Sequence, residues 1–237
     1  MNRQSLKYSS DEARQRFKKV ADNEKAAVHK IQQYLIKPLT IYADFENNSL
    51  NVSDTKLIVE KDGVVSGLFI GWNQLGELPS EIGTLSDLKI FYGQTNHLTQ
   101  LPDFWDRLHM LTRIGLCNNE LQELPTTMGK LKHLSYIDLS NNRFQQIPSQ
   151  IKEWNQTEVE LDYNPIGHFG PEILETTCIC YFTRDSPRLA IGYHGDVHFQ
   201  DESARIWNDA IDKYSGYRVD AEKVWDYIKE QIKKNSI

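Results

Sequence analysis

Three alternating residues near the C-terminus are the strongest candidates for chemistry: His194, Asp196 and His198. Residues two apart on a strand point to the same side, so these side chains could bind zinc. Cys178 and Cys180, on a neighbouring predicted strand, could add thiolate ligands. However, Cys-x-Cys lacks the usual two-residue spacer, and a half-exposed strand alternates polar residues in any case. We therefore predict no metal site and no cofactor, and keep the three alternating residues only as weak metal candidates.

Other routes to catalysis have less support in the sequence. Either Cys178 or Cys180 could be activated as a nucleophile by His194, but no motif of a cysteine hydrolase surrounds them. The phosphate-binding patterns G-x-x-x-x-G-K and G-x-G-x-x-G do not occur in the sequence. We therefore predict that the chain has no catalytic residues.

The composition limits the expected partners and compartment. Charged residues make up 25% of the chain and the formal net charge is −6, without the clustered basic face typical of nucleic-acid-binding domains. The opening residues contain no apolar signal region, and nowhere do about eighteen apolar residues follow one another. The three cysteines, which include Cys117, cannot all pair, and this favours reduced thiols. We expect a cytoplasmic monomer that binds neither nucleic acid nor membrane.

An internal repeat in the sequence predicts the architecture of the chain. Leucine or isoleucine followed by proline recurs every 23 residues, as Leu78-Pro79, Leu101-Pro102, Leu124-Pro125 and Ile147-Pro148. A column of asparagines accompanies it, namely Asn73, Asn96, Asn119, Asn142 and Asn164. Such a period predicts a solenoid of stacked units. Buried amides can bind the backbone of neighbouring turns, so we expect the asparagines to form a ladder along the solenoid.

The apolar positions within each repeat predict its secondary structure. Two apolar residues stand five and three positions before each asparagine in most repeats, which predicts a short strand with those side chains inward. They are Leu68 and Ile70, Ile114 and Leu116, Ile137 and Leu139, and Val159 and Leu161. After each proline, apolar residues three apart indicate a short helix or 3₁₀ segment on the outer side.

The segment from Leu124 to Gln146, LPTTMGKLKHLSYIDLSNNRFQQ, resembles the leucine-rich repeat family in its 23-residue subclass, with the consensus LPxxIxxLxxLxxLxLxxNxLxx. The resemblance extends over residues 64–167. It implies an α/β fold, a short right-handed horseshoe solenoid with a parallel sheet on its concave side. Phe91 and Gly93 replace the two strand leucines of one repeat, and we expect a neighbouring aromatic ring to fill the space at this glycine.

Two flanks complete the predicted organisation. Residues 1–63 are an N-terminal helical cap, with one helix from Ser10 to Ile36 and a Ser9-x-x-Glu12 capping box. Residues 39–50 are either a degenerate first repeat or a loop rich in Asn and Asp. Two strands, Leu57 to Glu60 and Val64 to Ile70, are expected around the turn at 61–63. Residues 168–237 form a small C-terminal α+β unit that begins with a strand at 178–183. Both flanks cover the ends of the repeats.

The strand register also predicts a binding surface on the concave face. Aromatic and apolar side chains gather at the early repeats, and carboxylates at the late ones, as in a docking face with an aromatic anchor and an acidic steering end. The predicted partner-binding residues are Phe69, Trp72, Ile90, Tyr92, Gln94, Arg113, Tyr136, Asp138, Glu158, Glu160, Asp162 and Tyr163. The alternative is that short strands tolerate any outward residue and that the carboxylates only solvate an edge.

These observations favour a non-catalytic protein-interaction module whose concave face binds a protein partner. The rival hypothesis is a repeat scaffold that targets a C-terminal domain with metal-dependent or thiol-based activity, hydrolase-like or ligase-like. Some bacterial leucine-rich repeat proteins carry ubiquitin ligase domains with a Cys-x-Asp motif. No cysteine of this chain is followed two residues later by aspartate.

Overall fold

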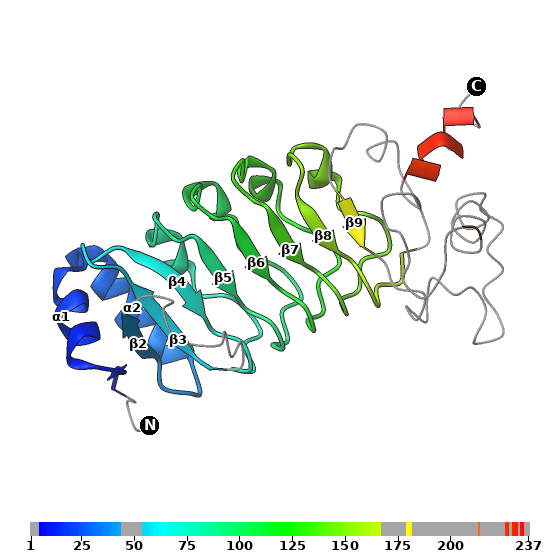
Figure 1. Ribbon diagram of the computed structural model, residues 1–237. Helices are drawn as coiled ribbons and strands as arrows, with labels where there is room; N and C mark the ends of the chain where they lie inside the picture. Colours follow the sequence, from blue (N-terminus) through cyan, green and yellow to red (C-terminus); the bar gives the residue numbers. More distant parts are fainter. Residues whose placement is uncertain are drawn as a thin grey trace.

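The computed structural model describes residues 5–43, 54–166 and 179–181, together with separate helical residues between 213 and 234. Within these residues one sheet of nine strands runs in sequence order from β1 to β9 (Figure 1). The strands are β1 Lys7–Tyr8, β2 Thr40–Ala43, β3 Lys56–Val59, β4 Val65–Phe69, β5 Ile90–Tyr92, β6 Arg113–Gly115, β7 Tyr136–Asp138, β8 Glu158–Glu160 and β9 Ile179–Tyr181. The mixed α/β solenoid expected from the repeat is confirmed.

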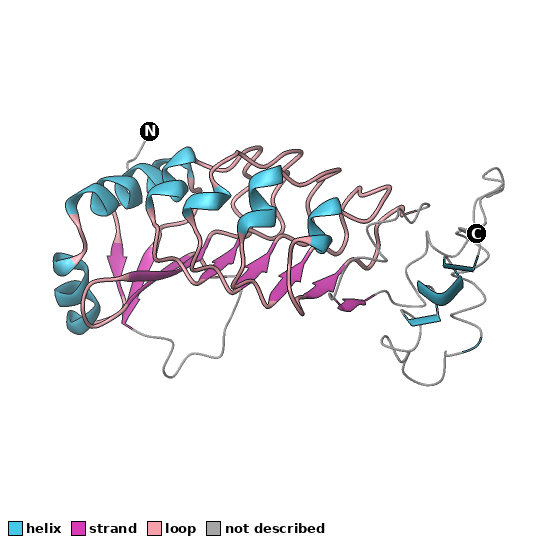
Figure 2. Ribbon diagram, turned by 90° about the horizontal axis from the view of Figure 1, so that it is seen from above, coloured by secondary structure: helices cyan, strands magenta, loops and turns pink. Residues whose placement is uncertain are grey.

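Short 3₁₀ segments cover the side of the sheet that packs on the core (Figure 2). They are η1 Ser80–Thr84, η2 Trp105–Arg107, η3 Thr126–Lys130 and η4 Ser149–Lys152. Prolines immediately precede three of them: Pro79, Pro125 and Pro148 have φ angles of −58°, −64° and −58°. The pyrrolidine ring holds φ in this range, so the recurring proline turns the chain from the sheet into the outer segment.

The apolar columns of the repeat form one continuous core between these two layers. The eight predicted strand residues, from Leu68 to Leu161, have no exposed surface. Burial of such a side chain contributes about 1.5–3 kcal/mol. Where Gly93 replaces a strand leucine, an added Cβ would lie 3.1 Å from the ring of Phe91. That ring also makes an edge contact with Trp105, so an aromatic side chain does fill the space at Gly93.

The asparagine ladder is present in all five repeats. In the third, the Asn119 amide group donates to the carbonyls of Gly93, Leu116 and Cys117, and its side-chain oxygen accepts from the Leu98 amide. Asn96, Asn142 and Asn164 make equivalent bonds, whereas Asn73 in the first repeat donates to the Thr55 hydroxyl and accepts from the Lys37 amide. All five side chains are nearly completely buried. From the second repeat onward, each side chain thus satisfies backbone groups of its own turn and of the preceding one.

The N-terminal cap differs from the single predicted helix. It contains two helices, α1 Asp11–Lys19 and α2 Asp22–Tyr34, separated by extended backbone at Val20 and Ala21. A straight helix over residues 10–36 would be about 40 Å long. Instead, α1 packs on strands β1, β2 and β3, whereas α2 packs on η1. Because the helix is broken at Val20 and Ala21, the N-terminal cap can cover both the first strands and η1.

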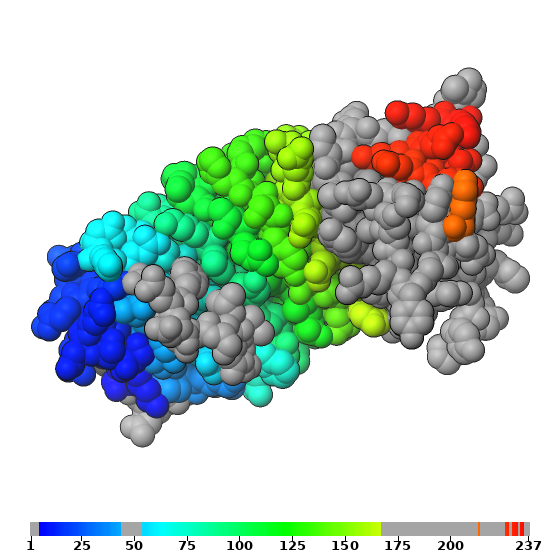
Figure 3. Space-filling model, viewed as in Figure 1, coloured from blue at the N-terminus to red at the C-terminus, as the bar shows by residue number. Residues whose placement is uncertain are grey.

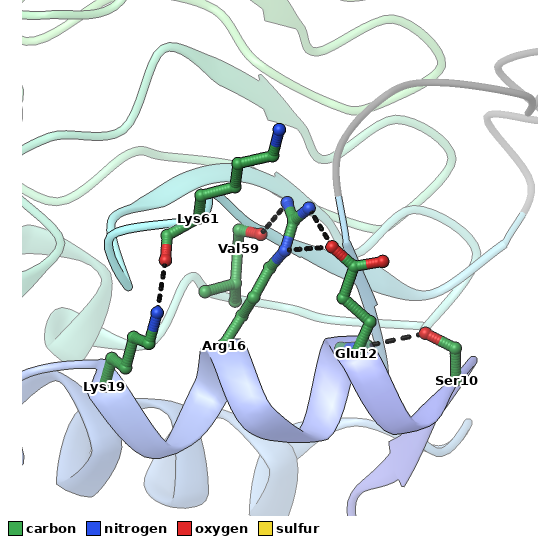
Figure 4. A network of polar contacts seen from close by, with 7 residues as sticks. Ser10, Glu12, Arg16, Lys19, Val59 and Lys61 are labelled. Carbon is green, nitrogen blue, oxygen red and sulfur yellow. Dashed lines mark hydrogen bonds and ion pairs between the residues drawn. The ribbon is translucent and has the colours of Figure 1, made fainter.

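The predicted capping box is wrong by one residue. Ser10, not Ser9, is the N-cap, and its hydroxyl accepts a bond from the Ala13 amide at 3.1 Å. Glu12 instead pairs with Arg16, whose guanidinium also donates to the Val59 carbonyl at 3.3 Å (Figure 4). These contacts attach α1 to β3.

The β3–β4 hairpin confirms both predicted strands, but it introduces one antiparallel pair into the sheet that was expected to be parallel. β3 and β4 are antiparallel, while β1 to β3 are parallel to one another and so are β4 to β9. Gly63 in the connecting turn has a φ of 92°, and an added Cβ would lie 2.7 Å from the Lys19 backbone. The turn therefore packs closely against α1. Residues 44–53, which decide between a degenerate repeat and a loop, lie outside the described residues.

The repeat sheet continues past residue 167. β9 lies inside the strand predicted at 178–183 and pairs in parallel with β8, with Cys180 opposite the core residue Val159. The remaining predictions for the C-terminal unit fall mostly outside the described residues, and the 64–167 boundary stays a prediction. Among the described helices, none is both long enough and apolar enough to span a membrane.

Candidate functional site

The open face is the side of β4 to β8 that points away from the core. Parallel pairing aligns two columns of residues on it, and no described helix crosses β5 to β8 there (Figures 1 and 3). One column is Gly67, Ile90, Arg113, Tyr136 and Glu158; the other is Phe69, Tyr92, Gly115, Asp138 and Glu160. These are the columns expected from the alternation in the sequence.

The aromatic end of the open face is less accessible than predicted. Phe69 stacks on Tyr92 with ring centroids 5.2 Å apart, but it has no exposed surface. The Lys56 ammonium lies 4.8 Å from the Phe69 ring because β3 pairs Lys56 with Phe69. Gln94 is only 4% exposed. A partner cannot reach Phe69 or Gln94 in this conformation, and Tyr92 is the accessible part of the stack.

Gly115 provides the space in which Tyr92 lies. A Cβ at Gly115 would be 2.2 Å from the Tyr92 Cδ1 atom, so only a residue without a side chain leaves room for the ring. Alternation along the strand places Gly115 on the outward side, but a glycine at that position indicates no role by itself. Its function in seating the ring could not be seen without the ring's position.

The acidic end begins at Tyr136. The Arg113 guanidinium lies 4.4 Å from the centroid of its ring, and the Tyr136 hydroxyl is hydrogen-bonded to Glu160. Asp138 lies opposite Glu160 in the pairing of β7 with β8 and accepts bonds from the amide and hydroxyl of Ser140 at 2.9 and 2.6 Å. The structure thus brings Arg113, Tyr136, Asp138 and Glu160 together, as one connected group.

Burial and negative charge shift three groups at this end in the same direction. Burial, followed by the charge of Asp138, raises the pKa of Glu160. Burial, together with the charges of Asp138 and Glu160, also raises the pKa of Tyr136. Burial and Asp138 raise the pKa of Cys117 to about 12. A neutral thiol and a neutral phenol are poor nucleophiles, so this arrangement is suited to binding a cation more than to covalent chemistry.

Trp72 and Tyr163 are the most exposed of the predicted residues with large rings, at 48% and 44%. They occupy the same place in the first and last repeats, directly before the ladder asparagine, with φ angles of 60° and 56°. Left-handed backbone is uncommon for bulky residues, but every repeat has it here, including Asn118 and Asn141. The conformation therefore belongs to the repeat, and the two aromatic residues lie at opposite ends of the array.

Metal binding finds no support in the described residues. Within residues 5–43 and 54–166, no three His, Cys, Asp or Glu side chains are placed to hold a metal ion. The weak candidates His194, Asp196 and His198 lie outside the described part of the chain, and so does the proposed thiol pairing with His194.

Comparison with known proteins gives one family match and several similar solved structures. Residues 133–154 match the family model described as Leucine Rich Repeat. No curated protein matches the sequence significantly. A leucine-rich repeat protein from Leptospira interrogans is similar in structure over 61% of this chain and 38% of its own, with 20% identity and a TM-score of 0.43. The BIR2 ectodomain from Arabidopsis thaliana is similar over 53% of this chain and 72% of its own, with 19% identity and a TM-score of 0.35.

The chain thus spans well under half the length of the Leptospira protein. The matched segment contains β7 and η4, and the same inward columns and asparagine bonds recur from β4 to β8. The chain therefore contains a leucine-rich repeat at residues 133–154, and the repeats from β4 to β8 that share its pattern form a solenoid.

Proposed function

We propose that this chain is a non-catalytic protein-interaction module that binds a protein partner on the open face of β5 to β8. The observation that carries the proposal is the accessible surface formed by Tyr92, Tyr136 and the adjoining carboxylates. Partly exposed aromatic rings beside charged groups are typical of binding hot spots. Their rigid support by the stacked repeats lowers the entropic cost of binding.

The absence of a catalytic role is part of the same proposal. Cys117 has a strongly raised pKa, as does Tyr136, and both therefore stay protonated at neutral pH. We further propose that the chain acts as a cytoplasmic monomer that binds neither nucleic acid nor membrane. The free thiol of Cys117 supports the cytoplasmic location. The net charge of −6 supports the absence of nucleic-acid binding. Sedimentation analysis tests the monomer.

Affinity capture with the full chain tests the binding proposal. Proteins captured by the wild type are identified, purified and titrated against a Tyr92→Ala/Tyr136→Ala variant. The control is a His109→Ala/Lys152→Ala variant, whose exposed residues lie on the side of the 3₁₀ segments. We expect the tyrosine variant to lose binding and the control to keep it.

Thermal melts separate lost binding from unfolding. Loss of the Tyr92–Phe69 stack costs about 0.5–1.5 kcal/mol, which leaves the protein folded. The proposed binding face would be refuted by a partner that binds the folded tyrosine variant as tightly as the wild type and fails to bind the His109→Ala/Lys152→Ala control.

A further inference from the structure

The open face contains an uneven distribution of charge that the proposed function does not by itself explain. Four carboxylates lie on β7, on β8 and two residues beyond the end of β8: Asp138, Glu158, Glu160 and Asp162. On this face, Arg113 on the neighbouring strand β6 carries a positive charge, and its guanidinium is stacked on Tyr136. The acidic end is therefore strongly negative without a partner.

The protein maintains this arrangement against a physical cost. Asp138 and Glu160 are direct neighbours across β7 and β8, where like charges are destabilising. The charge of Asp138 acts on Glu160, Tyr136 and Cys117, which lie on three adjacent repeats, and in each it opposes further negative charge. A positive charge placed beside Asp138 and Glu160 would relieve the repulsion between them.

Aromatic rings beside the carboxylates indicate what kind of cation fits. The Tyr92 ring lies over Gly115, and Tyr92 is close enough to Tyr136 to contribute to the raised pKa of the Tyr136 phenol. Lysine and arginine side chains pack their apolar stems on such rings while the charged end pairs with acids. The Arg113 guanidinium already lies over the Tyr136 ring, 4.4 Å from its centroid, which shows that this surface accepts a cation against an aromatic ring. A bare metal ion would gain nothing from the rings, and no described trio of ligands is placed to hold one.

We propose that the partner presents a basic segment to this surface, with lysine or arginine side chains packed against Tyr92 and Tyr136 and paired with Asp138 and Glu160. The inference rests on the proposed function and specifies the chemistry of the partner. Charge complementarity of this kind steers association and selects among partners.

A displayed library of random peptides, selected on the immobilised full chain, tests the inference. Parallel selections use an Asp138→Asn/Glu160→Gln variant and a Glu77→Gln/Glu123→Gln variant, which lose the same charge. Glu77 and Glu123 are exposed and lie outside the open-face columns. The substitutions are isosteric, and the side-chain amide oxygen introduced by Glu160→Gln can still accept the hydrogen bond from Tyr136. Glu158→Gln, at an exposed position on the same face, provides a second probe should the double variant fail to fold.

We expect the wild type and the matched variant to enrich peptides rich in lysine and arginine relative to the input library. A peptide so selected should bind the Asp138→Asn/Glu160→Gln variant at least about tenfold more weakly, and Glu158→Gln should weaken it in the same direction. Its affinity for the wild type should fall with added salt.

The contrary outcomes distinguish this inference from the proposed function. Peptides that require Tyr92 but are not enriched in basic residues would overturn the basic partner and leave the binding face standing. If basic peptides bind the Asp138→Asn/Glu160→Gln variant as well as the wild type, their binding depends only on the net charge of the protein. That result would also overturn the proposed basic segment at Asp138 and Glu160. If no enriched peptide depends on any open-face residue, both proposals fail.

Discussion

Replacement of Asn119 by alanine is the most direct test of the asparagine ladder. Four hydrogen bonds of 3.0–3.3 Å are lost, but their consequences differ. The carbonyls of Gly93 and Leu116 keep bonds from Asn96 and Asn142 at 3.0 Å. The buried Leu98 amide, in contrast, loses its acceptor. An unsatisfied buried donor costs about 1–3 kcal/mol, and with the net value of the lost bonds we expect a destabilisation of about 2–4 kcal/mol.

Denaturant and thermal unfolding measure this effect. For a protein of this size, the expected destabilisation lowers Tm by about 4–16 °C. Gln122→Ala is the matched control because Gln122 is exposed three residues further along the same turn, and its Tm should stay near that of the wild type. If Asn119→Ala and Gln122→Ala unfold at the same temperature and denaturant concentration, the ladder does not stabilise the repeats as argued.

Three further predictions concern the open face. Glu160→Gln removes the like charge opposite Asp138 and should raise the free energy of unfolding at pH 7 by about 0.2–1 kcal/mol. Because the folded-state pKa of Glu160 is raised, Glu160 contributes favourably to the free energy of unfolding at pH values below the ordinary carboxyl value of 4.5. This contribution is lost as pH rises through the folded pKa. The gain from Glu160→Gln should therefore shrink as pH falls toward 4.5. Gly115→Ala places a Cβ 2.2 Å from the Tyr92 ring, so near-UV circular dichroism should show a displaced tyrosine, and binding to the open face should be lost. In a Cys178→Ser/Cys180→Ser variant, Cys117 should react with iodoacetamide at pH 8 on the order of a thousandfold more slowly than an ordinary thiol, because its pKa is about 12.

Each of these predictions has a control within the chain. Glu123→Gln removes an exposed carboxylate outside the open face and should leave the free energy of unfolding at pH 7 near that of the wild type; an equal gain from both substitutions would contradict the local repulsion. Gly76 has open space around it, so Gly76→Ala should preserve the tyrosine signal that Gly115→Ala alters. Unfolding in guanidinium should restore ordinary reactivity to Cys117, and equal rates in the folded and unfolded chains would refute its raised pKa.

The repeat columns illustrate how far local sequence can predict this fold. Leu116, Leu139 and Asn119 recur at fixed positions because each repeat meets the same neighbours, and their burial follows from the period alone. The N-terminal cap has no such constraint. The break between α1 and α2 depends on which surfaces each helix packs against, and these are distant in sequence.

For the candidate site, alternation along short strands was sufficient to assign Tyr92, Tyr136, Asp138 and Glu160 to one face, because side-chain direction in a strand has a period of two. Only the tertiary structure decided that Phe69 is buried beneath Lys56 and Tyr92, that Gly115 makes room for a ring from the adjacent strand, and that Cys117 lies within the field of Asp138. Accessibility and pKa depend on atoms brought together from different repeats, so these properties are decided by packing across strands.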